Sequence, residues 1–280
     1  MEKIKIITDS TADLSEELYN KYDIEVLPLL INIGEESYLD GVEITPKEIF
    51  DYIKSESGQL PTTAQVIPNR FMETYKKYLD EGYKIISIHL SSAMSGTYQS
   101  ACIAKNMIES DDIYVIDSQN VTSALGILVL KAATLIQKGE KVDKVCDELE
   151  KVKENIKASI YFESLDNLVK GGRISRTAGI VGNALGIKLI VEIKDGLMSV
   201  KDKIRGNKRV IKKIIEDLEV QELDKDVPVI LVDVENIEVK EGLQKYLEEK
   251  KINYEVCPVG TTVSIHAGPN CCGLAFLNKE

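Results

Sequence analysis

Loops rich in hydroxyl side chains are the first feature of the sequence that could do chemistry. Three of them follow expected strands, at residues 8–11, 91–97 and 117–118, and a fourth, at residues 61–65, precedes an expected helix. Ligands of open parallel sheets bind beyond the carboxyl ends of the strands. In the richest loop, 91–97, the hydroxyls and the free N–H groups of a helix start can all donate to an anion. Any one loop alone fits helix capping, but the four together favour an anion site.

The two histidines differ in their setting. His266 precedes Gly268 and Pro269, which make a turn, so we expect its ring on a loop, where it could donate to an anion or act as a base. The ordinary alternative is an exposed histidine without a role. His89 lies inside an apolar stretch, and we interpret it as a hydrogen-bonded residue of the core.

The elements that must position these loops alternate in the first half of the chain. Expected strands cover residues 3–8, 24–33, 84–89 and 113–116, and expected helices begin near Asp13, Thr45, Pro68, Ser95 and Val121. Thr45 and Glu48 have the spacing of a capping box, with Pro46 at the first helical position, and Asp13 and Glu16 have the same spacing. This alternation predicts a mostly parallel sheet with helices on both faces.

The second half of the chain has a different order. Asp195 and Gly196 form a hairpin signal between expected strands 188–193 and 197–204, and hairpin strands pair antiparallel. The other expected elements are strands 156–162, 227–232 and 253–259 and helices 208–218 and 239–250. The sequence therefore predicts an α/β protein of two domains. Residues 1–155 form the first domain, with the mostly parallel sheet. Residues 156–280 form an α+β domain with a mixed sheet, and its last residues are candidates for a return to the interface between the domains.

Composition narrows the classes of partner. The 280 residues include 35 Lys and Arg against 46 Asp and Glu, a net charge of −11, which disfavours binding to nucleic acid. Five scattered cysteines without a C-x-x-C pair are typical of reduced thiols in a cytosol. We find no secretory signal, and the most apolar stretch, 121–136, is too short to span a bilayer. We therefore expect a cytoplasmic protein without stable membrane insertion.

Three segments are rich in positive charge or in glycine, and each could contact a partner or a ligand. Residues 194–213 contain eight Lys and Arg and two Asp, and Arg173 and Arg176 follow Gly171-Gly172. These cations form either a solvated face or a docking surface for an acidic partner or phosphate, and DNA binding would require them to overcome the net negative charge. The glycines of residues 178–187 lower helix stability, which favours either close helix packing or room for an apolar ligand.

Five motifs in order give the chain a resemblance to the DegV family along essentially its whole length. They are ITDSTADL at 7–14, PTTAQ at 61–65, SSAMSGTYQSA at 91–101, GGRIS at 171–175 and HAGP at 266–269. Each motif is modest alone, but five in the same order are highly specific. The resemblance implies a two-domain α/β protein that buries one long-chain fatty acid in an apolar tunnel between its domains.

The resemblance also implies a role and a set of residues. Such a protein is a lipid-binding carrier rather than an enzyme, and it presents the carboxylate to an ATP-dependent fatty acid kinase that forms an acyl-phosphate for phospholipid synthesis. No metal or cofactor besides the fatty acid is implied, and membrane contact is at most transient. By this resemblance the carboxylate is bound by Thr63, Ser95 and His266, with Thr62 and Ser92 nearby, and the residues at the mouth that face the kinase are Arg173 and Arg205.

Some positions depart from the family pattern, and two other functions stay open. Val66 follows the second motif where the family often has proline, residues 270–272 (NCC) are bulkier than usual, and residues 205–209 read RGNKR. These differences leave the chain-length preference and the partner contact open.

The first alternative is a serine hydrolase acting on acyl esters, with Ser95 or Ser92 as nucleophile and His266 as base, although the sequence has no G-x-S-x-G motif. The second is a metal phosphoesterase built on Asp9 and Asp117. Because the chain has only two histidines, its set of metal ligands would be poor.

Overall fold

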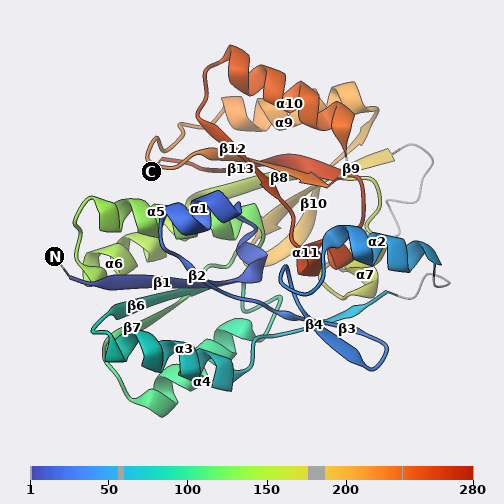
Figure 1. Cartoon of the computed structure of the whole chain (residues 1–280). Coiled ribbons are helices and arrows are strands. Elements are labelled where there is room, and N and C mark those ends of the chain that lie inside the picture. The colour runs from blue at the N-terminus through green and yellow to red at the C-terminus, as the bar shows by residue number, and fades with distance from the viewer. Residues whose placement is uncertain (1, 56–59, 176–186, 235, 280) are drawn as a thin grey trace.

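The structure is a computed structural model that describes residues 2–55, 60–175, 187–234 and 236–279. Strands in these residues form three sheets, of four, six and three strands. Helices lie between the two larger sheets and also cover their outer faces (Figure 1). Of the expected features, the glycine-rich segment 178–187, apart from Ile187, and Arg176 lie outside the described residues.

The four-stranded sheet is entirely parallel, as the alternation of elements predicted. Its order is β2-β1-β6-β7, with strands β1 (Ile4–Asp9), β2 (Glu25–Leu27), β6 (Lys84–His89) and β7 (Ile113–Asp117). Side chains alternate between the two faces of a strand. Ile6 and Ile86 therefore pack with α5 (Ser123–Gln137) and α6 (Val142–Val152), while Ile7 and Ile85 pack with α3 (Pro68–Asp80) and α4 (Thr97–Ile108).

The six-stranded sheet is mixed and uses the second half of the chain. Its order is β10-β9-β8-β13-β11-β12, with β8 (Ile156–Phe162), β9 (Ile187–Lys194), β10 (Leu197–Arg205), β11 (Val229–Val234), β12 (Tyr254–Pro258) and β13 (Cys271–Leu277). Only β11 and β12 pair parallel. Helices α9 (Asn207–Glu219) and α10 (Ile237–Glu249) pack on one face through residues such as Ile214 and Leu243.

A third sheet is formed within residues 30–64 and packs against a helix from the last part of the chain. Its strands are β3 (Leu30–Ile33), β4 (Glu36–Leu39) and β5 (Thr62–Ala64), all antiparallel. Helices α2 (Pro46–Ser55) and α11 (Thr261–Ala267) share a small core with it through Ile31, Ile49 and Ile265. Helix α11 also contacts α7 (Asp166–Lys170) and the short 3-10 helix η1 (Ser10–Ala12). The last part of the chain thus returns to N-terminal elements.

Helix α5 lies at the centre of the molecule. It contacts β1 and β6 on one side and β8, β11 and β13 on the other, and all its residues from Ser123 to Ala133 are buried. A helix that is apolar all round belongs in a core. Lys131 is the buried cation of this helix, and its Nζ lies 2.6 Å from Asp224 and 3.3 Å from Asp226. This cluster therefore links α5 to the loop before β11.

Several local predictions can be compared with the structure. The capping box before α2 is confirmed, because Thr45 N–H donates to Glu48 at 2.8 Å. The helix start at Asp13 was wrong: α1 (Glu16–Lys21) is capped by Ser15, while Asp13 has φ 48° after η1. The single strand expected at 24–33 is interrupted at Pro28, which lies between β2 and β3. Proline has no N–H for a sheet ladder, so the chain changes sheets there.

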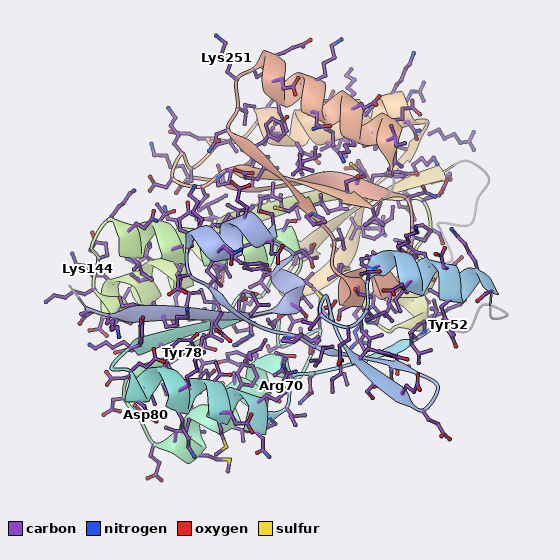
Figure 2. The ribbon with its side chains drawn as sticks, viewed as in Figure 1. Tyr52, Arg70, Tyr78, Asp80, Lys144 and Lys251 are labelled. Carbon is purple, nitrogen blue, oxygen red and sulfur yellow. The ribbon has the colours of Figure 1, made fainter. Side chains whose placement is uncertain are left out.

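The remaining elements are short, and the surface is charged. A second 3-10 helix, η2 (Lys153–Asn155), precedes β8, which is the first strand of the six-stranded sheet along the chain. Every strand of that sheet therefore follows residue 155. The division into domains at this residue stays a prediction. Side chains such as Asp80, Lys144 and Lys251 point outward (Figure 2). Among the described helices, none is both long and apolar enough to cross a membrane.

Candidate functional site

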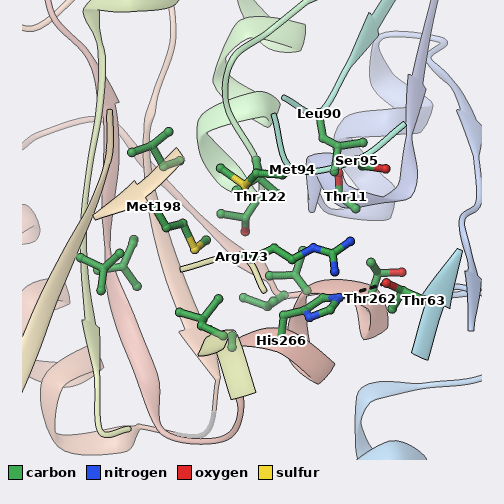
Figure 3. Close-up of a pocket in the computed structure, with 18 of the residues that line it drawn as sticks. Thr11, Thr63, Leu90, Met94, Ser95, Thr122, Arg173, Met198, Thr262 and His266 are labelled. Carbon is green, nitrogen blue, oxygen red and sulfur yellow. Dashed lines mark hydrogen bonds between the residues drawn. The ribbon is translucent and has the colours of Figure 1, made fainter. Parts of the chain in front are cut away.

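A cavity of about 300 Å³ lies between the carboxyl edge of the parallel sheet and one face of the six-stranded sheet (Figure 3). Most of the described residues that line it are apolar, and they come from both halves of the chain. Leu90 and Met94 follow β6, Val121 precedes α5, and Ile160 and Val191 lie on β8 and β9. The volume is at the lower end of the range for small-molecule sites, and the apolar wall suits a hydrocarbon.

A histidine–hydroxyl pair lies in the wall of this cavity. Thr63 Oγ1 and His266 Nε2 are 3.0 Å apart, although 203 positions separate the two residues in the sequence. Thr63 lies on β5 and His266 in the last turn of α11, so the expectation of His266 on a loop was wrong. The turn at Gly268 and Pro269 comes after this helix and ends it, so it does not place the His266 ring on a loop. We call Thr63 and His266 the cavity pair.

A glycine allows the imidazole of His266 to lie against the end of α7. A Cβ atom added to Gly171 would lie 2.4 Å from His266 Nδ1, closer than any side chain could tolerate. Gly171 is the residue that ends α7, and its N–H donates to Asn167 O at 2.8 Å. The GGRIS motif therefore positions the histidine as well as presenting Arg173.

The imidazole of His266 is neutral near pH 7. Burial, and to a smaller extent the nearby Arg173 guanidinium, lower its pKa to about 4. A neutral imidazole has one N–H donor and one acceptor nitrogen. Whichever of the two residues donates in the Thr63–His266 hydrogen bond, the cavity pair has one donor left for a ligand.

Ser95 also lines the cavity, at the start of α4. Its Oγ accepts from Thr97 N–H at 3.3 Å and lies 3.1 Å from Thr97 Oγ1, so it contributes to the helix start as well. Gly96 beside it has no room for a side chain, because an added Cβ would lie 1.9 Å from Gln65 Oε1. The second and third motifs of the sequence therefore meet at this point.

The other predicted site residues do not all reach the cavity. Arg173 lines it, and Figure 3 draws its guanidinium above the His266 ring, on the side away from Met198. Thr62 lies in a second, outer cavity of about 390 Å³. Ser92 is exposed and lies outside both cavities among the described residues. Arg205 lies in a separate hollow with other cations, Lys188, Lys208 and Arg209.

The outer cavity shares part of its wall with the inner one. Thr63, Arg173 and His266 line both, and Lys170 at the end of α7 lines the outer cavity alone. Lys170 is exposed, and its ammonium makes no ion pair with a described carboxylate. The cavity pair therefore lies between an apolar cavity on one side and a polar, cationic opening on the other.

Three threonines of the cavity wall were missed as site residues. Thr11 Oγ1 donates to Asp9 at 2.5 Å, and Thr122 Oγ1 donates to Asp13 at 2.6 Å. Thr262 lines the cavity with no partner for its hydroxyl. Thr11 belongs to one of the hydroxyl-rich loops that the sequence indicated. Thr262 lies on α11, a helix that was not predicted, so no signal in the sequence placed it at the site.

A second histidine is built into a network that resembles a catalytic triad. His89 Nδ1 lies 3.0 Å from Asp9 Oδ2, and His89 Nε2 lies 2.6 Å from Ser87 Oγ, which also accepts from Tyr75 OH at 2.7 Å. All four side chains have no exposed surface. We call these residues the buried network. The prediction of His89 as a satisfied core residue is confirmed.

Neither alternative chemistry finds its expected contacts. His266 contacts Thr63 rather than Ser95, and no described carboxylate contacts its ring. Within the described part of the chain, no group of three or more His, Cys, Asp and Glu is placed to hold a metal. Asp117 instead accepts from the backbone N–H groups of Ser92 and Gln119.

Comparison with known proteins places the chain among close relatives. The family model described as "Uncharacterised protein, DegV family" matches residues 3–279. A DegV domain-containing protein of Clostridium perfringens is 52% identical over 279 residues, which is 100% of both chains.

Solved structures share the whole fold. A DegV family protein from Thermus thermophilus, described by its fatty acid binding, has a TM-score of 0.90 at 27% identity and covers 99% of this chain and 100% of its own. DegV from Bacillus subtilis, described as a fatty acid binding protein, has a TM-score of 0.84 at 29% identity, with 100% of both chains covered. The two-domain α/β class predicted from the sequence is thereby confirmed.

Proposed function

Because the chain belongs to the DegV family, we propose that it binds one long-chain fatty acid in the inner cavity and presents the carboxylate to an ATP-dependent fatty acid kinase. The observation that carries the proposal is an apolar cavity whose wall holds Thr63, Ser95 and His266. By this proposal the protein is a cytoplasmic carrier that meets the membrane only transiently and feeds acyl groups toward phospholipid synthesis. Its binding residues are Thr63, Ser95 and His266.

The apolar wall supports a hydrocarbon tail as the main source of affinity. Burying each methylene contributes about 0.8 kcal/mol, so a tail of some fourteen methylenes brings roughly 11 kcal/mol before ordering costs. Residues from both halves of the chain, such as Leu90 and Val191, would contact it. A ligand held this way lies between the two larger sheets.

The polar residues support a carboxylate as the head group. An ionised carboxylate is very costly to bury without partners, and it accepts hydrogen bonds only. Ser95 supplies a hydroxyl donor, and the pair of Thr63 and the neutral imidazole of His266 has one further donor left in either tautomer. Arg173 adds a cation in the same wall. Of the two further residues implied by the resemblance, Thr62 would act from the outer cavity and Ser92 has no direct route to the ligand.

The outer cavity supports presentation to a kinase. In the proposed reaction a carboxylate oxygen attacks the terminal phosphorus of ATP, the bond to ADP breaks, and an acyl-phosphate forms. The transferred group must approach from outside, and the outer cavity reaches Thr63 and His266 past Lys170 and Arg173. Arg205 lies apart from this opening, so its proposed part is docking an acidic surface of the kinase.

Native mass spectrometry of freshly purified protein tests lipid binding, followed by extraction and identification of any lipid carried along. We expect one fatty acid per chain. Ser95→Ala then tests the head group: with the partner kinase and ATP it should lower acyl phosphorylation at least tenfold and lower stability by no more than about 1 kcal/mol. Unchanged binding and phosphorylation would remove Ser95 from the site.

The serine hydrolase remains the alternative, with Ser95 or Ser92 as nucleophile and His266 as base. Hydrogen bonds of catalytic residues can be long before substrate binds, so geometry alone does not decide between the two functions. Incubation with long-chain acyl esters does. Turnover with release of the alcohol supports the hydrolase, whereas stoichiometric binding of the free acid without turnover supports the carrier.

A further inference from the structure

Thr262 differs from every other hydroxyl residue described in the wall of the inner cavity. Its side chain is only 5% exposed, and its Oγ1 has no hydrogen-bond partner. The others all have one: Thr63 contacts His266, Ser95 contacts Thr97, and Thr11 and Thr122 donate to Asp9 and Asp13 respectively. The protein therefore provides partners for all these cavity hydroxyls except one.

An unpartnered hydroxyl in such a place is costly unless a ligand satisfies it. Leaving a buried donor unpaired costs about 1–3 kcal/mol relative to a hydrogen-bonded state. Ser123 shows the same lack of a partner but does not line the cavity, so burial alone does not explain Thr262. The distinction is that an atom inside the cavity could reach the Thr262 hydroxyl.

The position of Thr262 indicates which ligand atom that is. Thr262 and His266 are four residues apart on α11, so their side chains lie on the same face, about 5–6 Å apart at Cβ. Figure 3 draws Thr262 beside Thr63 and His266. Under the proposed function the ligand group nearest to all three is the head, since Thr63 and His266, which contact each other, are its proposed binding residues.

We infer that the Thr262 hydroxyl donates a hydrogen bond to the carboxylate of the bound fatty acid, as a binding residue additional to Thr63, Ser95 and His266. A carboxylate offers two oxygens with about four acceptor positions, so it has capacity for a further donor. This inference rests on the proposed function and names a new residue of the same site. It also gives a hydrogen-bond partner to the one hydroxyl of α11 that lacks a partner in the protein, since Thr261 and Ser264 donate to backbone carbonyls.

The decisive variant is Thr262→Val, which keeps the shape and removes the hydroxyl. Measured by isothermal titration of delipidated protein with palmitate, its affinity should fall about tenfold or more, because hydrogen bonds to charged groups are the stronger ones. Without ligand its melting temperature should stay equal or rise, since a buried unpaired group is gone. Thr262→Ser keeps the hydroxyl, and its affinity should stay within about threefold of the wild type.

Two matched controls separate this role from simple packing. Ser123→Ala removes the other hydroxyl that is buried without a partner in the described part of the chain, and it should leave palmitate affinity unchanged. Thr122→Val removes a hydroxyl that donates to Asp13, so it should lower stability without ligand. Wild-type affinity in Thr262→Val overturns the inference, as does a loss confined to fatty acids that carry a hydroxyl on the chain. Failure of the wild type to bind palmitate would instead sink the proposed function itself.

Discussion

Two parts of the molecule join a histidine to hydroxyl side chains, and they differ in access and in completeness. In the buried network, both ring nitrogens of His89 have partners, Asp9 and Ser87, and Tyr75 closes the chain of hydrogen bonds. In the cavity pair, only one ring nitrogen of His266 has a described partner. The first set has no exposed surface, whereas the second lines two cavities.

The difference shows why residue types alone do not mark a site. Ser87, His89 and Asp9 have the contacts of a catalytic triad, yet no substrate could reach them without unfolding the sheet. A fully satisfied network stabilises a fold, while a partly satisfied one has capacity for a ligand. His266 and Thr262 belong to the second kind.

The largest effect is expected from removing the carboxylate of the buried network. Asp9 accepts from His89, from Leu90 N–H and from the backbone and hydroxyl of Thr11. Asp9→Ala leaves these donors unpaired and should lower the free energy of unfolding by about 3–5 kcal/mol. Thr63→Ala, in the cavity wall, should cost under about 1 kcal/mol. Urea denaturation of both delipidated variants measures this, and equal losses would remove the contrast.

The next effect is a pH dependence that belongs to His266. Because its folded pKa of about 4 lies below the usual 6.5, the unfolded chain binds a proton that the folded chain does not, and stability falls as the pH drops through this window. Between pH 7 and pH 5 the loss is about 2 kcal/mol. His266→Asn removes the group, so unfolding free energies of delipidated protein should fall less steeply for the variant. Parallel curves would contradict a buried neutral imidazole.

A smaller effect is expected at the glycine that holds the ring in place. In Gly171→Ala the new methyl group would meet His266 Nδ1, so the imidazole should shift and fatty acid affinity should fall about tenfold, or 1.4 kcal/mol. Gly242→Ala is the matched control, since its Cβ would lie 2.6 Å from Ile211 Cδ1, on a helix that does not line the cavity. It should lower stability without changing affinity. Titration with palmitate measures both variants.

Local patterns predicted most of the fold, and long-range pairing did not follow from them. The alternation around β1, β6 and β7 gave a parallel sheet, and Asp195-Gly196 gave the antiparallel hairpin of β9 and β10. Strand β13 was missed, although it lies at the centre of the six-stranded sheet between β8 and β11. Its neighbours are distant in sequence, and its continuous burial gives no alternation to read.

The candidate site was predictable where a motif carried it. Thr63, Ser95 and His266 were singled out, and the structure places all three in the wall of one cavity. The helix that carries His266 was not predicted, because its seven residues begin without a side-chain cap and end at Gly268. The sequence therefore offered no reason to expect Thr262 on the same helix face as His266. Its importance depends on an unpaired atom, which is a property of packing rather than of sequence.

The smallest effect is expected at Ser92, and it tests access most directly. Ser92 and Ser95 are the same residue type three positions apart in one motif, yet Ser92 is exposed and Ser95 lines the cavity. The Ser92 hydroxyl has no described partner, and only its N–H is used, donating to Asp117. Ser92→Ala should therefore change stability by less than about 0.5 kcal/mol, and palmitate affinity by less than twofold. If Ser92→Ala weakened palmitate binding while Ser95→Ala did not, the exposure of a side chain in the free protein would not identify the residues that bind the ligand. The loop that carries both serines would then have to change conformation when the ligand binds.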